Sequence, residues 1–317
     1  MSWEVIIPFL RPIEPLLRDP DISDVMVNGS GSVFAEKEGR MYPVPDVAIN
    51  EKSLQVAVRN IARVLGDDIN EEQPLLDARL PDGSRVAAVF PPCSIGGTTL
   101  TIRKFQSKKY TADELVRIDA LPAALLIRLQ DAVQRRQNML IAGGTGAGKT
   151  TLLNALAALI PEDERLVVIE DTSEIQIDKP NLVRLEVRRE QPGVAAVTIR
   201  DLLKATLRLR PDRILVGEVR DGAAFDLLQV LNTGHSGTLS TIHANSARDV
   251  LSRFTTCVLQ SGINQPYRSI RRNIAESVHL LVYLSRNQGK RQVTEVLAVR
   301  NYEPDQDRYE LEVLYER

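Results

Sequence analysis

The stretch IAGGTGAGKT, residues 141–150, decides the fold of this chain. It places four glycines in six residues, directly after an apolar run and directly before the segment TLLNALAALI. Glycine is unfavourable inside helices and strands, so this cluster indicates a position where bare backbone is needed. Residues 143–150 fit the pattern G-x-x-x-x-G-K-[ST], which is typical of a loop that binds phosphate groups.

The pattern assigns a role to each part of this loop. Its backbone N–H groups can curl around a phosphate, and the following helix directs its positive end at the anion. Lys149 would reach the β- and γ-phosphates, and the hydroxyl of Thr150 would bind Mg²⁺. The alternative is a chance match in a glycine-rich turn, although a strand before the loop and a helix after it argue against that. The residues expected to bind ATP are Gly143, Gly144, Thr145, Gly146, Ala147, Gly148, Lys149, Thr150 and Thr151.

The pattern of predicted strands and helices changes near residue 105. Residues 1–105 contain short alternating strands broken by turn signals, which indicates an N-terminal α+β domain. Polar residues 106–118 are the expected linker. In residues 119–317, continuous apolar runs such as 165–171 and 213–219 alternate with helical patterns. This alternation predicts an α/β domain whose mostly parallel sheet is covered by helices on both faces.

The bulk composition is that of a globular protein. The chain has 317 residues, 43% apolar and 26% charged, with a net charge of -2, which argues against DNA binding by bulk charge alone. Its two cysteines form no CxxC pair, which suits a reducing compartment. No run approaches the roughly 20 apolar residues of a membrane span, and the first residues do not resemble a signal peptide. We therefore expect a cytoplasmic protein, which can still dock on a membrane assembly.

Acidic residues end two of the expected strands. RILVGEVR ends in Gly217-Glu218, and a carboxylate at the C-terminal end of a parallel strand lies beside the phosphate loop. Glu218 is thus a candidate catalytic base that polarises water, or a ligand that holds Mg²⁺ through water. Glu170 and Asp171 end another strand and are candidates for the same tasks. The alternatives are a surface glutamate at Glu218 and a solvated turn at Asp171.

Two histidines, His235 and His243, bracket the predicted strand GTLSTI. One interpretation is a sensor that donates a hydrogen bond to the γ-phosphate, with His243 as the catalytic candidate. Zinc binding is an alternative, but it needs three or four ligands and no cysteine lies near in sequence. A structural hydrogen bond is the other alternative, and it suits His235 better than His243. His279 begins an apolar strand and is expected to be structural.

Arginines complete the set of candidates, because a guanidinium commonly stabilises the charge on a γ-phosphoryl group during transfer. In the N-terminal domain, Arg79, Arg85 and Arg103 fall on outward positions of alternating strands. The C-terminal candidates are Arg188, Arg189, Arg208, Arg210 and Arg220. For each of these arginines, the alternative to a role at the γ-phosphate is that of a solvated surface charge.

These motifs together resemble the type II/type IV secretion ATPase family, nearly end to end. The resemblance is carried by GGTGAGKTTLLNAL (143–156), VVIEDTSEI (167–175), the long block RDLLKATLRLRPDRILVGEVRDGAAFDLLQVLNTGHSGTLSTIHAN (200–245) and, upstream, SRV with LTIRKF. The family has a Walker A loop, an acidic Asp box, a Walker B strand ending in Glu, and a His box. By motif these are Gly143–Thr150, Glu170–Glu174, Ile214–Glu218 and Gly234–His243.

The resemblance implies a RecA-like C-terminal ATPase domain, a PAS-like N-terminal domain and assembly as a homohexamer. It implies that Arg85 and Arg103 contact the nucleotide, with ATP and Mg²⁺ as cofactors. The family's rings sit on the cytoplasmic face of inner-membrane secretion or pilus platforms, which would be the partners here. The segments DPDISDVMVNG (19–29) and DGSRVAAVFPP (82–92) most resemble the Flp/Tad pilus and conjugal-transfer branches.

The expected function is ATP hydrolysis by a ring-shaped motor for type IV secretion, conjugal transfer or pilus assembly. The alternative is a RecA-like, nucleic-acid-dependent ATPase of the recombinase or helicase class, for which the aromatic content of 4% offers little base stacking. No direct nucleic-acid site is evident. The sequence lacks the arginine-rich lid insertion expected of a small-molecule kinase and the [NT]KxD base-reading motif expected of a GTPase. A non-catalytic, nucleotide-gated scaffold is a further alternative.

Overall fold

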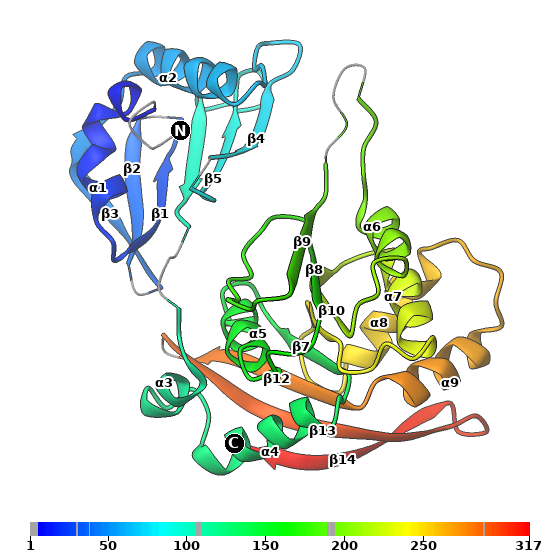
Figure 1. Ribbon diagram of the computed structural model, residues 1–317. Coiled ribbons are helices and arrows are strands. Elements are labelled where there is room, and N and C mark those ends of the chain that lie inside the picture. Colours follow the sequence, from blue (N-terminus) through cyan, green and yellow to red (C-terminus); the bar gives the residue numbers. More distant parts are fainter. Residues whose placement is uncertain are drawn as a thin grey trace. The chain divides into compact units, whose positions relative to one another are not determined.

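The computed structural model describes residues 6–29, 31–37, 39–80, 82–105, 109–188, 190, 194–287 and 289–317. The chain forms two compact units, Met1–Lys108 and Lys109–Arg317, and each is described by itself (Figure 1). Of the expected linker, residues 106–108 lie outside the described residues. The remainder belongs to the second unit, where helix α3 (Ala112–Arg117) buries Ala112 and Leu115.

The described part of the first unit is a six-stranded sheet in the order β3-β2-β1-β6-β5-β4, with antiparallel neighbours. Helix α2 begins after Asn50, whose side chain accepts a hydrogen bond from the N–H of Ser53 at 2.9 Å. The elements are η2 (Ile7–Phe9), η3 (Arg11–Ile13), α1 (Glu14–Arg18), β1 (Ile22–Val27), β2 (Ser32–Lys37), β3 (Arg40–Ala48), α2 (Glu51–Val64), β4 (Leu75–Arg79), β5 (Arg85–Val89) and β6 (Thr99–Arg103).

One face of this sheet packs against α2 and forms the hydrophobic core of the unit. Apolar residues of α2 pack in the same cluster as Val86 and Ile102 of the strands. Successive strand residues point to opposite faces, so the neighbours Arg85 and Arg103 point away from this core. The alternating pattern thus gives an α+β unit with two arginines on the face opposite this core.

The described part of the second unit is an eight-stranded sheet in the order β14-β13-β12-β7-β11-β10-β8-β9. The strands from β12 to β9 are parallel to their neighbours, and β13 and β14 are antiparallel. The strands are β7 (Met139–Gly143), β8 (Leu166–Glu170), β9 (Leu182–Glu186), β10 (Arg213–Val219), β11 (Leu239–Ile242), β12 (Leu280–Asn287), β13 (Lys290–Glu303) and β14 (Arg308–Glu316).

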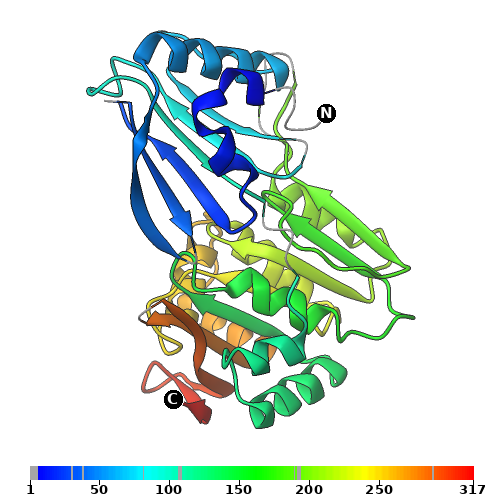
Figure 2. The ribbon, with the colours of Figure 1, turned by 90° about the vertical axis from the view of Figure 1, so that its left-hand side faces the viewer.

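Helices cover both faces of this sheet (Figures 1 and 2). One core cluster joins the sheet to α3, α4 (Ala123–Gln134) and α5 (Lys149–Ala157). The other joins it to α6 (Ile199–Thr206), α7 (Ala223–Asn232), α8 (Val250–Leu259) and α9 (Tyr267–Ser277). Strands β7 and β8 are buried at every residue, as strands between two helical layers must be. The predicted α/β fold is confirmed.

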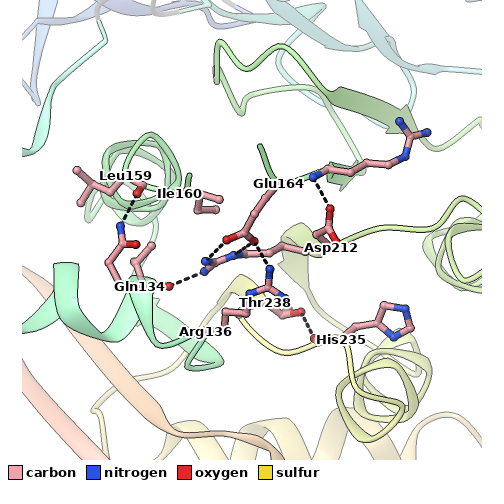
Figure 3. A network of polar contacts seen from close by, with 12 residues as sticks. Gln134, Arg136, Leu159, Ile160, Glu164, Asp212, His235 and Thr238 are labelled. Atoms are coloured by element: carbon pink, nitrogen blue, oxygen red, sulfur yellow. Dashed lines mark hydrogen bonds and ion pairs between the residues drawn. The ribbon is translucent and has the colours of Figure 1, made fainter. Parts of the chain in front are cut away.

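A buried ion pair fixes the start of β10 (Figure 3). The fully buried Arg213 donates from Nε and Nη2 to the carboxylate of Glu164 at 2.6 and 2.8 Å, and from Nη1 to the carbonyl of Val133 at 2.6 Å. Arg136 Nη2 lies 3.2 Å from the same carboxylate. The hydrogen bonds from Arg213 lower the pKa of Glu164. Segments from α4, the loop before β8, and β10 therefore meet at one charged cluster.

Candidate active site

The phosphate loop follows directly from the buried strand β7. Gly143 has φ +153° and Gly148 has φ +97°, values that favour glycine. A Cβ on Gly143 would lie 2.4 Å from the carbonyl oxygen of Leu284, so only glycine fits there. Gly148 is the N-cap of α5, which places the helix N-terminus and its unpaired N–H groups at the loop.

Lys149, the first residue of α5, is buried with 8% of its surface exposed. Its Nζ donates to the carbonyl oxygens of Gly143 at 3.0 Å and Gly144 at 2.9 Å. Burial lowers the pKa of this ammonium group, and the charge of Glu218 opposes the effect. The lysine is therefore held at the loop, where phosphate oxygens would be within its reach.

The strand order brings the predicted acids and histidine to the loop. Strands β7, β11, β10 and β8 are parallel neighbours, so their carboxyl ends meet at one edge of the sheet. Glu170 ends β8, Glu218 lies at the end of β10, and His243 follows β11. All of them share the edge at which β7 passes into the loop.

Glu218 lies between two basic side chains. Its Oε1 is 2.9 Å from Nε2 of His243, and its Oε2 accepts a hydrogen bond from Nη2 of Arg220 at 2.6 Å. Arg220 Nη1 is also 3.8 Å from Oδ2 of Asp171. Desolvation lowers the pKa of His243, which favours the neutral imidazole, while Glu218 opposes this. The hydrogen bond from Arg220 restrains the Glu218 carboxylate, and His243 lies beside its other oxygen.

Glu170 is more deeply buried, with 2% of its surface exposed. Its Oε1 accepts the backbone N–H groups of Glu174 at 2.8 Å and Ile175 at 2.7 Å, and its Oε2 is 3.8 Å from Arg184 Nη2. Burial raises the pKa of Glu170 to about 7, although these contacts oppose the shift. Glu170 thereby organises the loop that carries Glu174, whose Oε2 lies 3.5 Å from the hydroxyl of Thr150.

The variant Glu170→Gln should change how stability depends on pH. The folded pKa of about 7 lies above the ordinary value of 4.5, so the folded protein keeps a proton that the unfolded chain loses. The free energy of unfolding should therefore fall as pH rises from about 4.5 to 7, by up to about 3 kcal/mol. Glutamine cannot lose that proton, so urea unfolding at pH 5 and pH 8 should show a smaller fall in the variant. Equal falls in the free energy of unfolding of the two proteins would contradict the raised pKa of Glu170.

The two histidines of the predicted His box do not meet. His235 precedes β11, where its Nδ1 is 3.2 Å from Oγ1 of Thr233 and its carbonyl accepts the hydroxyl of Thr238 (Figure 3). His243 lies beyond the other end of that strand, so the two cannot ligate one metal ion together. His279 accepts the backbone N–H of Asn138 at 3.0 Å, which is a structural contact.

Arg85 and Arg103 lie in the first unit, whereas the phosphate loop lies in the second. They sit directly opposite each other on β5 and β6. Arg85 makes two hydrogen bonds to Asp77, at 3.0 and 2.9 Å, and Arg103 donates to Asp24 at 2.9 Å. Like charges directly opposite each other destabilise a sheet, and the two aspartates offset this cost.

The C-terminal arginine candidates differ in their surroundings. Arg188 donates to the carbonyl of Ala195 at 3.2 and 3.0 Å, and Arg208 and Arg210 are exposed. Arg189 lies outside the described residues. Arg220 alone among the described candidates touches a predicted catalytic acid. Its position two residues after Glu218, on the same side of an extended chain, is the signal that could have predicted this contact.

Comparisons with known proteins show the family of this chain. A family model described as "Type II/IV secretion system protein" matches residues 10–305. Conjugal transfer protein TrbB of Rhizobium radiobacter is 36% identical over 290 residues, which cover 90% of this chain and 86% of that protein. Type IV secretion system protein VirB11 of Bartonella henselae is 32% identical over 328 residues, covering 92% of each chain.

Solved structures show the same fold. The crystal structure of the VirB11 ATPase from the Brucella suis type IV secretion system, in complex with sulphate, has a TM-score of 0.51 and 32% identity. It covers 93% of this chain, and 94% of that chain is matched. The pilus retraction motor PilT with bound ADP has a TM-score of 0.60 at 16% identity, covering 99% of this chain and 83% of that one, and supports the fold alone.

Proposed function

Because the chain belongs to the type II/IV secretion system protein family, we propose that it hydrolyses ATP to power type IV secretion or conjugal transfer. One observation carries the proposal: the phosphate loop with Lys149 and the carboxylate of Glu218 lie at the same edge of one parallel sheet. The relatives named for conjugal transfer and type IV secretion support this choice of process. Pilus assembly stays a prediction from the sequence.

The residues around the loop suit a magnesium nucleotide. Magnesium prefers oxygen ligands, and the hydroxyl of Thr150 lies 3.5 Å from the carboxylate of Glu174. The charges of Glu174 and Glu218 both act on the neighbouring Lys149. Thr150 would bind the ion directly, and Glu170 and Glu218 would act through water. When bound, Mg²⁺ neutralises charge on the phosphates. The backbone N–H groups of the loop and Lys149 bind the phosphate oxygens.

Glu218 serves as the general base in this proposal. A water attacks the γ-phosphorus, the bond to the bridging oxygen of ADP breaks, and the proton of the water passes to the Glu218 carboxylate. His243 and Arg220 orient that carboxylate through the contacts at 2.9 and 2.6 Å. Product release then returns the proton to solvent.

Arg85 and Arg103 would contact the γ-phosphate, as the family resemblance implies. Arg103→Ala should then lower hydrolysis at least tenfold with little change in nucleotide affinity, because the contact strengthens during phosphoryl transfer. The matched control is Arg18→Ala, which removes an equally exposed arginine from the same unit: the side chains of Arg18 and Arg103 are 59% and 60% exposed. Wild-type turnover in Arg103→Ala would remove it from the mechanism.

The proposed working form is a homohexamer at the cytoplasmic face of an inner-membrane secretion platform. In the part of the chain that the structure describes, none of the helices combines the length and apolar character needed to cross a membrane. Size-exclusion chromatography with light scattering, with and without a non-hydrolysable ATP analogue, tests the assembly. A monomer at every protein and nucleotide concentration would contradict the ring.

Phosphate release by the purified chain tests the activity itself. MgATP should be hydrolysed, and chelating the magnesium should stop the reaction. Single-stranded DNA added to the same assay separates the two classes of motor. Turnover that depends on DNA would favour the recombinase or helicase class, and an absence of turnover under every condition would contradict the proposal.

A further inference from the structure

The hairpin of β12 and β13 extends past the end of the strand that carries the phosphate loop. Strand β12 pairs in parallel with β7, and the last pair in their register is Leu284 with Gly143. Strand β12 continues to Asn287, and β13 begins at Lys290. The end of the hairpin therefore lies alongside the loop rather than alongside β7.

Two arginines face each other near the end of this hairpin. Arg286 of β12 and Arg291 of β13 are directly paired in the antiparallel register. Leu284 and Val293, each two residues away, belong to the core cluster that contains α5. Residues two apart in a strand share a face, so both arginines lie on the face from which the loop enters α5.

Both side chains lie close to the loop. A Cβ built on Gly146 would lie 3.6 Å from Nη1 of Arg286, and one built on Gly148 would lie 3.7 Å from Cδ of Arg291. Together with Lys149, these residues concentrate positive charge around the loop. A bound polyphosphate would be attracted to this positive charge.

The sheet order suggests which end of the nucleotide they meet. Strand β12 flanks β7 on one side, and β11 and β10, which carry His243 and Glu218, lie on the other. The γ-phosphate must lie next to the base that activates water, so the α-phosphate lies farther from β10. The hairpin approaches the loop from that opposite side.

We propose that Arg286 and Arg291 form a clamp for the α-phosphate end of the nucleoside triphosphate held by the phosphate loop. Guanidinium groups suit this role because they bind phosphate oxygens through paired N–H donors. The inference rests on the proposed function, since it concerns the same site. It adds a binding contact that is independent of the hydrolytic residues.

Equilibrium titrations with MgATP and MgADP test the clamp in Arg286→Gln, Arg291→Gln and the double variant. Each single substitution should weaken ATP and ADP by the same factor, on the order of fivefold, because both nucleotides carry the phosphates on the nucleoside side of the γ-phosphate. Raising the salt concentration should weaken binding less in the variants than in the wild type. Arg286→Lys and Arg291→Lys should recover part of the affinity, which a purely structural defect would not allow.

The matched control is Lys290→Gln, which removes a cation from the same hairpin at a position pointing to the opposite face. If the arginine variants bind both nucleotides as the control does, the clamp is wrong, while the proposed function stands as long as the wild type binds ATP. Weakening of ATP alone would place the arginines at the γ-phosphate and overturn the assignment. A wild-type protein that binds neither nucleotide would overturn the proposed function as well.

Discussion

Glu218→Gln is expected to lower the turnover of MgATP by a factor on the order of 10² to 10⁴ while nucleotide binding stays intact. Glutamine has nearly the same shape as glutamate but cannot take a proton from the attacking water. The carboxylate lies 2.9 Å from His243 and 2.6 Å from Arg220, so the wild-type group is already oriented for this step. Steady-state phosphate release and equilibrium ATP titration measure the two effects separately.

Glu186→Gln is the matched control for this variant. Glu186 is an exposed glutamate at the carboxyl end of β9, in the same parallel sheet, where it pairs in register with Glu170. Its substitution should leave turnover within about twofold of the wild type, since surface changes usually have small effects. Wild-type turnover in Glu218→Gln would remove this residue from the role of base.

Arg213→Met should destabilise the second unit by about 3–5 kcal/mol. The substitution leaves the carboxylate of Glu164, whose side chain is 9% exposed, without the two hydrogen bonds that hold it, and the carbonyl of Val133 without its donor. Arg136, at 3.2 Å, compensates only in part because it is half-exposed. Urea unfolding at neutral pH measures the loss.

Two further variants identify the cause of that loss. Arg300→Met breaks the exposed pair with Glu312 and should cost no more than about 1 kcal/mol. Arg213→Met combined with Glu164→Leu should recover much of the stability, because no unpaired charge stays buried. An Arg213→Met protein within 1 kcal/mol of the wild type would show that the buried pair does not hold α4, β10 and the loop before β8 together.

The core of the site could be predicted because parallel strands end at a common edge. The glycine pattern identified the loop, and Glu170, Glu218 and His243 each lie at or just past the end of an apolar strand. Their meeting then follows from the topology rather than from any single motif. Where strands alternate with helices in this way, the sequence contains enough information to place such residues together.

Other features depend on contacts that the sequence does not display. Arg213 looks like an ordinary arginine before a strand, and its partner Glu164 lies 49 residues away. Arg286 comes close to the loop only because β12 lies next to β7 in the sheet. Helix α8 was not predicted, although the spacing of its buried residues Val250, Phe254 and Val258 is helical and could have revealed it.

The binding of MgATP by the wild type and by Lys149→Ala tests the central claim most directly. The claim is that a glycine cradle and one buried lysine hold a triphosphate, and Nζ of this lysine lies 3.0 and 2.9 Å from the loop carbonyls. The wild type should bind, and the variant should bind at least about tenfold more weakly, a loss of 1.4 kcal/mol or more. Equal affinities, or no binding by the wild type, would contradict the account.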